Sequence, residues 1–162
     1  MIIIHGNKNQ GKTTQVKRVI KHLLNKNKTI MGFYSEKIII NDIVIAYDLI
    51  TVPQNEKYPF LNSIKKNKQQ IGSFFIDKHA ITKGFSQIEK AIINNTDYVI
   101  IDEVGKLELD NKGWNIAIEK LLYEFKGEII LSIRTEFIEE IIEKWKLKNI
   151  KLIFCKNMNF KF

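Results

Sequence analysis

Two glycines, a lysine and two threonines near the start of the chain have the spacing of a phosphate-binding loop. The segment Gly6-Asn7-Lys8-Asn9-Gln10-Gly11-Lys12-Thr13 fits the pattern G-x-x-x-x-G-K-[ST] at every fixed position. The glycines allow the backbone to wrap closely, so that successive N–H groups can point at phosphate oxygens. We expect Lys12 to reach the β- and γ-phosphates, Thr13 to bind Mg²⁺ and Thr14 to bond the α-phosphate. A helix beginning near Lys12 would add the positive end of its dipole.

Two carboxylates directly follow an apolar run in the middle of the chain. Tyr98-Val99-Ile100-Ile101 has the composition of a buried strand, and Asp102 and Glu103 come next. Ligands of open α/β sheets bind at the C-terminal ends of strands, so this pair is expected to face the phosphate loop. Asp102 would then hold magnesium, directly or through water, and Glu103 would orient or deprotonate an attacking water. The alternative is an ordinary strand end with two solvated acids.

The same residues admit a second interpretation. Asp102-Glu103-Val104-Gly105 also fits the D-x-x-G pattern of small GTPases. Those proteins read guanine with an Asn-Lys-x-Asp motif, and Asn111-Lys112-Gly113-Trp114 lacks the aspartate. A guanine-specific GTPase is therefore not favoured.

Arg134 is a third candidate catalytic residue beside Lys12 and Glu103. It follows the apolar run Ile129–Ile133, and it could sense γ-phosphate charge if that strand neighbours the strand of the phosphate loop. It could equally be a surface arginine that pairs with Glu136 or another acid. Ser35 and Glu36, at the end of their own predicted strand, are candidates for orienting the residues that contact the ligand, with a purely structural role as the alternative. Cys155 is expected to be a core thiol, since no histidine lies near it in sequence.

Short apolar runs alternate with helical patterns and would position these residues. Buried strands are predicted at 2–4, 98–101, 129–131 and 150–154, and helices from the apolar stripes at 16–24, 85–92, 114–125 and 138–145, the last capped by Thr135. Two β-branched runs, 38–40 and 43–45, predict an added β-hairpin that turns at Asn41-Asp42. The polar segment 51–70 holds both prolines and predicts a loop, followed by a short strand within 71–76. Strands that alternate with helices predict an α/β fold, with a mainly parallel three-layer sheet in a single domain over residues 1–162.

Composition narrows the class of protein further. The net charge is +8, but only Arg18 and Arg134 of the 26 basic residues are arginine, the residue that sequence-specific nucleic-acid readers prefer. The run Lys65-Lys66-Asn67-Lys68 is not interleaved with aromatics, so a solvated surface is favoured over a nucleic-acid patch. No apolar stretch approaches the length of a membrane span, and the N-terminal apolar run is too short for a signal peptide. One cysteine excludes an internal disulfide, and we expect a cytoplasmic protein.

Three segments resemble, in the same order, the thermophile-type nucleoside-triphosphatases, a family also called cancer-related nucleoside-triphosphatases. They are Gly11-Lys12-Thr13-Thr14, Gly32-Phe33-Tyr34-Ser35-Glu36 and, most specific of the three, Asp102-Glu103-Val104-Gly105-Lys106-Leu107-Glu108-Leu109. The resemblance implies a RecA-like P-loop NTPase fold with an additional catalytic glutamate, and places the strand near Ile130 between those of the phosphate loop and Asp102. It also implies magnesium-dependent release of the γ-phosphate from ATP, GTP and other triphosphates, with little base selectivity. Glu103 matches the catalytic glutamate and Asp102 the magnesium aspartate.

This chain departs from the family inside the phosphate loop. Lys8, Asn9 and Gln10 stand where the family usually has Pro, Gly and a small apolar residue. Asn tolerates left-handed backbone geometry, so we expect Asn9 to hold the turn. Two other functions remain open from the sequence. One is a nucleotide or small-molecule kinase, in which the Lys-rich segment 65–68 would serve as a lid. The other is an ATP-dependent regulatory module acting on a partner or nucleic acid. The scarcity of arginine argues against the kinase, because kinase lids commonly carry it.

Overall fold

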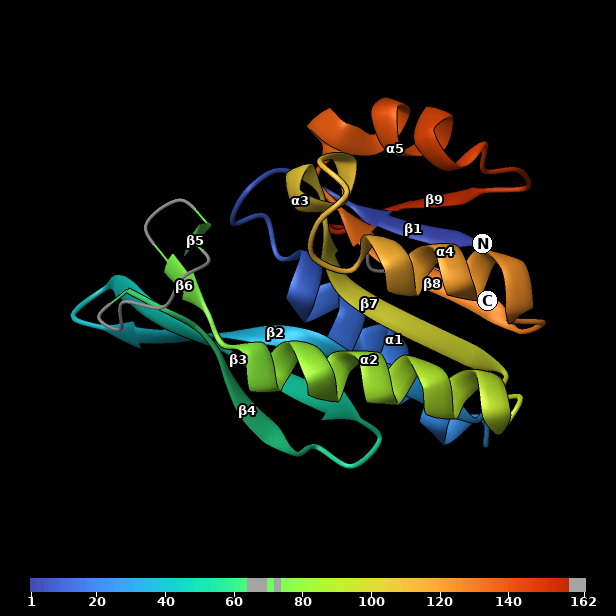
Figure 1. Ribbon diagram of the computed structural model, residues 1–162, viewed down its shortest axis with the longest axis horizontal. Helices are drawn as coiled ribbons and strands as arrows, with labels where there is room; N and C mark the ends of the chain where they lie inside the picture. Colours follow the sequence, from blue (N-terminus) through green and yellow to red (C-terminus); the bar gives the residue numbers. More distant parts are fainter. Residues whose placement is uncertain (64–69, 72–73, 158–162) are drawn as a thin grey trace.

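The computed structural model describes residues 1–63, 70–71 and 74–157, and within them the chain forms one sheet of nine strands (Figure 1). The strands are β1 (Ile2–His5), β2 (Ile30–Ile40), β3 (Ile43–Val52), β4 (Lys57–Asn62), β5 (Gln70–Ile71), β6 (Phe74–Ile76), β7 (Tyr98–Val104), β8 (Glu128–Ile133) and β9 (Lys151–Phe154). The helices are α1 (Lys12–Asn25), α2 (Lys78–Ile93), α3 (Lys106–Leu109), α4 (Asn115–Glu124), the 3₁₀ turn η1 (Thr135–Phe137) and α5 (Ile138–Trp145).

The centre of the sheet is parallel. The order is β5-β6-β4-β3-β2-β7-β8-β1-β9, and every pairing from β2 to β9 in that order is parallel. β8 therefore lies between β1, which leads into the phosphate loop, and β7, which ends in Asp102 and Glu103. This confirms the expected strand order. Because parallel strands end at the same edge of a sheet, the polar residues after β1, β7 and β8 meet there.

Helices cover both faces of the parallel strands, which makes three layers (Figure 1). On one face, Val16, Val19 and Leu23 of α1 pack in a buried cluster with Ile4 of β1 and Ile130 of β8. The opposite face packs against α2, α4 and α5. Its buried cluster includes Ile3, Ile101 and Leu131 from the strands with Ile88, Ile118 and Ile141 from the helices. Successive side chains of a strand point to opposite faces, so the uninterrupted isoleucine runs supply both clusters.

The predicted hairpin is confirmed and projects from one end of the sheet (Figure 1). β2 and β3 are antiparallel, and Ile40 pairs with Ile43 across the turn. Both turn residues have positive φ, 49° for Asn41 and 62° for Asp42. Two-residue hairpin turns require this geometry, and Asn and Asp tolerate it better than other side chains.

The prediction of a loop throughout 51–70 is wrong at β4. Lys57–Asn62 pairs antiparallel with β3 and carries Pro59 opposite Asp48. The register shifts between Tyr47 and Asp48, an irregularity of the kind where a strand accommodates proline. Long-range pairing with β3 thus outweighs the local loop composition. Residues 65–68 lie outside the described residues.

The prediction that Thr135 caps the helix at Ile138–Trp145 is also wrong. Thr135 begins the turn η1 instead, and its hydroxyl lies 3.3 Å from Nδ1 of His5 at the end of β1. Neither η1 nor α5 has a side-chain hydrogen bond from its N-cap residue.

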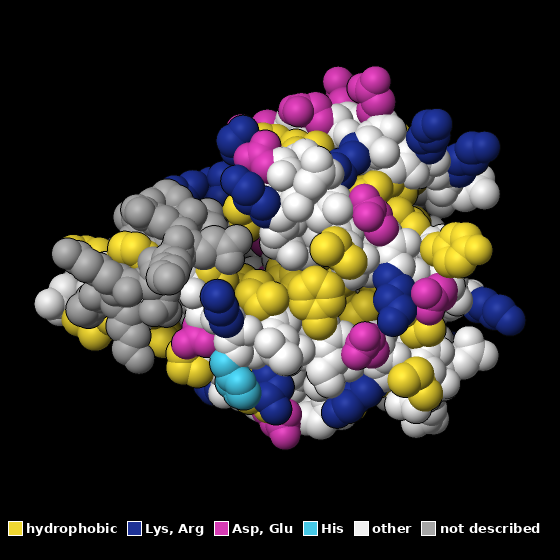
Figure 2. All heavy atoms as spheres, viewed as in Figure 1, with side chains coloured by type: hydrophobic (Ala, Val, Ile, Leu, Met, Phe, Trp, Pro, Cys, Tyr) yellow, Lys and Arg dark blue, Asp and Glu magenta, His cyan; other side chains and the backbone are white. Residues whose placement is uncertain are grey.

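The surface shows basic side chains dispersed among acidic ones rather than gathered in a stripe on the face of Figure 2. In the part of the chain that the structure describes, no helix is both long and apolar enough to cross a membrane.

Candidate active site

The phosphate loop leaves β1 at His5 and enters α1 at Lys12, as the pattern predicts. Asn9 has φ 63°, which confirms that it holds the left-handed position, and Gly11 has φ 92°. The Gln10 backbone N–H donates to the Asn7 carbonyl at 3.2 Å. The Gln10 side chain turns back and accepts from the Asn7 N–H at 2.8 Å. The unusual loop residues therefore form an internally bonded turn.

The buried thiol of Cys155 supports this loop from beneath. It is 3% exposed and donates to the Gln10 carbonyl at 3.1 Å, which confirms a core thiol. A β-carbon at Gly6 would overlap the Cys155 sulfur. The packing of the loop on Cys155 therefore requires glycine at position 6.

Lys12 lies where the phosphate loop enters α1 and is 7% exposed. Its Nζ donates to the Asn7 carbonyl at 3.3 Å and lies 3.5 Å from Oε1 of Glu103. The lysine therefore lies between the phosphate loop and the carboxylate at the end of β7.

Asp102 is buried at the end of β7, and three polar groups converge on it. The Thr13 hydroxyl donates to Oδ2 at 2.8 Å, the Ser35 N–H donates to Oδ2 at 3.3 Å, and the Ser132 hydroxyl donates to Oδ1. Burial raises the pKa of Asp102, while the hydrogen bonds from Ser132 and Thr13 oppose the rise because they favour the charged carboxylate. The Ser35 hydroxyl also donates to the Asp102 carbonyl at 3.1 Å.

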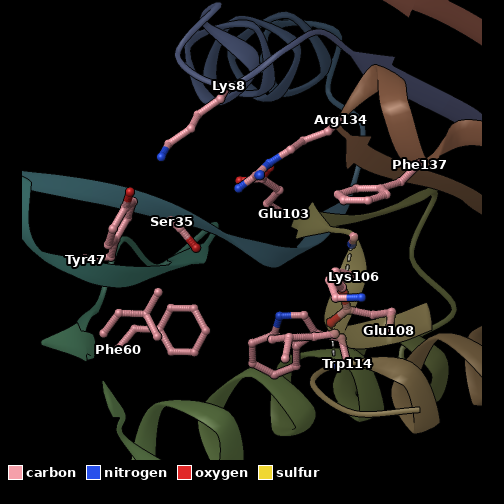
Figure 3. Close-up of a pocket in the computed structure, with 13 residues that line it drawn as sticks. Lys8, Ser35, Tyr47, Phe60, Glu103, Lys106, Glu108, Trp114, Arg134 and Phe137 are labelled. Carbon is pink, nitrogen blue, oxygen red and sulfur yellow. Dashed lines mark hydrogen bonds and ion pairs between the residues drawn. The ribbon is translucent and has the colours of Figure 1, made fainter. Parts of the chain in front are cut away.

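Glu103 lies on the solvent side of Asp102 and meets Arg134. Nε of Arg134 donates to Oε1 of Glu103 at 2.8 Å, and its guanidinium lies 3.7 Å from Glu136. Arg134 thus pairs with two acids, Glu103 and Glu136, and through Glu103 it lies beside the strand-end carboxylates (Figure 3). Its role toward a γ-phosphate stays a prediction.

Glu36, Lys17 and Lys37 also line the site. Lys17 of α1 forms an ion pair with Glu36, and Lys57 lies 3.6 Å from it. The hydrogen bond from Lys17 lowers the pKa of Glu36. Lys37 donates to the side-chain carbonyl of Asn9 at 2.6 Å and so ties β2 to the phosphate loop.

Together these groups surround a cavity of about 380 Å³. Its lining includes the loop residues Lys8, Asn9, Gly11, Lys12, Thr13 and Thr14, with Lys17, Ser35, Glu36, Lys37, Tyr47, Asp102, Glu103 and Arg134. Sequence reasoning missed Ser132, Lys17 and Lys37. Ser132 could have been found as the lone polar residue inside a buried strand, whereas Lys17 and Lys37 are two among many lysines.

The oxygen donors here fit magnesium. Mg²⁺ is usually bound by one or two carboxylates and by substrate phosphates. The Thr13 hydroxyl and the Asp102 carboxylate lie 2.8 Å apart at the mouth of the phosphate loop. The donor set is all oxygen, which is the chemistry this cation prefers.

Comparison with known proteins finds similarity to nucleoside-triphosphatases. A family model described as NTPase matches residues 1–159. Nucleoside-triphosphatase THEP1 from Thermotoga maritima is 26% identical over 157 residues, which are 96% of this chain and 86% of that protein. The protein of the same name from Saccharolobus solfataricus is 27% identical over 135 residues, 83% of this chain and 77% of that protein.

Two solved structures share the fold. A crystal structure of THEP1 from Aquifex aeolicus has a TM-score of 0.75 at 23% identity, covering 96% of this chain and 90% of that one. A solution structure of a human cancer-related nucleoside triphosphatase has a TM-score of 0.70 at 21% identity, covering 94% and 87%. At these identities the likeness concerns the fold alone.

Proposed function

The chain belongs to the NTPase family, and on that basis we propose that it hydrolyses nucleoside 5′-triphosphates to the diphosphate and phosphate with magnesium. ATP and GTP are among the substrates, and selectivity between bases is low. The observation that carries the proposal is the meeting of a phosphate-loop lysine with a strand-end carboxylate: Nζ of Lys12 lies 3.5 Å from Glu103, beside the Thr13–Asp102 pair.

The phosphate loop binds the triphosphate in this proposal. Backbone N–H groups between Gly6 and Gly11 and the N-terminus of α1 face the phosphate oxygens. Lys12 turns from the Asn7 carbonyl and Glu103 to the β- and γ-phosphates, because a phosphate offers it more negative charge. Thr14 contacts the α-phosphate.

Thr13 and Asp102 would hold the magnesium ion, which when bound neutralises charge on the phosphates. The hydrogen bonds that Asp102 accepts from Ser132 and the Ser35 N–H fix the orientation of its carboxylate. The assignment is supported by the position of both residues, because Thr13 and Asp102 line the same cavity and are hydrogen-bonded to each other.

Glu103 acts as the general base. Its carboxylate accepts a proton from a water molecule as the oxygen of that water attacks the γ-phosphorus. The bond from the γ-phosphorus to the bridging oxygen breaks, and the nucleoside diphosphate leaves with that electron pair. Arg134 holds Glu103 through Nε and adds positive charge next to the transferred group. Low base selectivity follows from the chemistry of the described lining, which is directed at phosphate and metal. We place this activity in the cytoplasm.

The test is a phosphate-release assay with ATP, GTP, CTP and UTP, each with magnesium and with excess chelator. We expect release from all four nucleotides, rates within about tenfold of one another, and loss of release with chelator. A rate ratio above about a hundredfold for one base would contradict the low selectivity, and undiminished release in chelator would contradict the role of magnesium.

A further inference from the structure

A second cavity of about 420 Å³ adjoins the first (Figure 3). The two share the lining residues Lys8, Ser35, Tyr47, Glu103 and Arg134. A molecule in the second cavity would therefore contact the carboxylate and the guanidinium that face the γ-phosphate position. A single water occupies about 30 Å³ of liquid, whereas small-molecule sites span about 300–1,000 Å³. This space is larger than hydrolysis requires.

The walls of the second cavity suit a flat, apolar molecule. The rings of Phe60 and Trp114 have centroids 5.8 Å apart and form one side, and Phe137 and Leu61 complete the apolar lining. Phe60 is 8% and Trp114 3% exposed, so packing holds both rings in place. Fixed aromatic faces favour stacking with another planar ring.

Basic side chains outnumber acidic ones in the lining of this cavity, where Lys8, Lys106 and Arg134 face Glu103 and Glu108. Glu103 is engaged by Arg134, and Glu108 uses one oxygen for the Gly105 N–H at 2.8 Å and the other for the Trp114 N–H at 2.9 Å. Lys8 lines both cavities. Lys106 is 76% exposed and has Asp110 3.9 Å away, a distance that leaves most of its hydrogen-bonding capacity open. A ligand here meets the ammonium groups of Lys8 and Lys106, while the nearest carboxylate, Glu103, is paired with Arg134 through one oxygen. This balance favours an anion.

We propose that the second cavity binds a planar aromatic anion that carries a hydroxyl group, and that this hydroxyl accepts the γ-phosphoryl group in place of water. The hydroxyl oxygen forms a new bond to the γ-phosphorus, and its proton passes to the Glu103 carboxylate. The bond from the γ-phosphorus to the bridging oxygen breaks, and the nucleoside diphosphate leaves with that electron pair. The inference rests on the proposed function, because both reactions use the same bound triphosphate and Glu103.

Binding is tested on the full chain with ATP and magnesium already bound. The probe is 1-anilinonaphthalene-8-sulfonate, an aromatic anion without a hydroxyl group, followed by its fluorescence. We expect one saturable site, weakened at least about tenfold by Lys106→Glu, which reverses a lining charge, and by Leu61→Trp, which fills the space. The exposed Lys112 lies outside the lining, and Lys112→Glu is the matched control that should bind as the parent does.

Thermal unfolding and ATP binding show whether the Leu61→Trp variant is folded. If that variant is not folded, the effect of Lys106→Glu on probe binding alone decides the test. Probe binding that neither variant weakens, or that falls as the ATP concentration is raised, would overturn the second site.

Transfer is tested with 4-hydroxybenzoate, 4-(hydroxymethyl)benzoate and salicylate as competitors of the probe. For each compound that displaces it, we expect more diphosphate than free phosphate, with the difference recovered on the compound. Lys106→Glu should reduce this excess at least about tenfold, and Lys112→Glu should not. Displacement by none of the three, or equal diphosphate and phosphate with a compound that binds, would overturn the acceptor. Absence of phosphate release in water alone would instead overturn the proposed hydrolase.

Discussion

Arg134 donates from Nε to Oε1 of Glu103 at 2.8 Å, where β8 and β7 end side by side. The same Glu103 oxygen lies 3.5 Å from Nζ of Lys12, so one carboxylate oxygen faces two cations. Only Lys12 belongs to the phosphate loop, and a bound triphosphate would draw it away. Arg134 would then remain to orient the carboxylate. Substitutions can therefore distinguish the roles of Lys12 in binding phosphate, of Glu103 as the base and of Arg134 in orienting that base.

Replacing the base should stop chemistry and leave binding intact. We expect Glu103→Gln to lower the rate of phosphate release by ~10²–10⁴-fold, the usual contribution of a positioned general base. The dissociation constant for ATP with magnesium should change little, because the amide keeps the shape and the loop is untouched. Stopped-flow phosphate release and equilibrium titration measure the two quantities.

Glu136→Gln is the matched control, since Glu136 is the other acid near Arg134 and is 62% exposed. It should retain the parent rate. Undiminished phosphate release in Glu103→Gln would remove Glu103 from the mechanism.

Replacing the guanidinium beside Glu103 by an ammonium group should lower the rate of turnover more than the affinity for the nucleotide. We expect Arg134→Lys to lower kcat at least about tenfold, because an ammonium group lacks the planar fork that holds Glu103 and still reaches Glu136. Steady-state kinetics would show the loss in kcat with a small change in KM. If Arg134→Lys turned over at the parent rate, Arg134 would be a surface residue that pairs with acids only.

Removing the loop lysine should eliminate both charge neutralisation and tight binding. We expect Lys12→Ala to release phosphate at less than about one-hundredth of the parent rate. Lys21→Ala is the matched control on the same helix, because Lys21 is exposed and outside both cavities. Full activity in Lys12→Ala would contradict the assignment of the phosphate loop.

Much of the fold could be predicted because its signals are local. The isoleucine runs of β1, β7 and β8 bury both faces, and the loop pattern between β1 and α1 is fully specified by residue type. Asn41-Asp42 has the chemistry of a hairpin turn. β4 escaped prediction because its pairing with β3 is long-range and its own sequence contains Pro59.

Less of the site could be predicted from the sequence, because it too depends on long-range contacts. Asp102 and Glu103 could be found from their place after a strand, but the contacts that orient them come from distant parts of the chain. Ser132 reaches Asp102 across 30 positions, and Arg134 reaches Glu103 across 31. The second cavity has no motif, because Phe60 and Trp114 meet only through tertiary packing.

Gly32 controls how closely the strand of Ser35 approaches the strand of Asp102. It pairs with Ile100 of β7 at φ 125°, and a β-carbon there would overlap the Ile100 carbonyl oxygen. We expect Gly32→Ala to lower the free energy of unfolding by more than about 2 kcal/mol, from backbone strain and strand separation. Urea denaturation measures the loss.

Gly105→Ala is the control for that substitution. Gly105 has an extended backbone with φ −175°, and its β-carbon would lie 3.3 Å from Cδ2 of Phe137. A loss below about 1 kcal/mol is expected there. Equal losses in the two variants would show that the approach of β2 to β7 is not what Gly32 protects.

Asp97 should make the stability of the chain depend on pH at the end of the sheet opposite the cavities. Its carboxylate accepts the Thr29 backbone N–H and hydroxyl, each at 2.8 Å, and lies 3.4 Å from Nζ of Lys28. The Thr29 backbone hydrogen bond, the Thr29 hydroxyl and the Lys28 ammonium hold the pKa of Asp97 below its usual value of 3.8.

A carboxyl whose pKa is lower in the folded chain stabilises the fold above the unfolded pKa, and that stabilisation is lost as pH falls through the folded value. We therefore expect Asp97→Ala to reduce the free energy of unfolding at pH 7 and to lessen the drop that the parent shows below about pH 4. Urea denaturation across this range measures both. Asp110→Ala is the control, since Asp110 is 47% exposed and its partner Lys106 is 3.9 Å away. The parent and the Asp97→Ala variant could instead lose the same amount of unfolding free energy as the pH falls. That result would show that the contacts with Thr29 and Lys28 do not depend on the charge of Asp97.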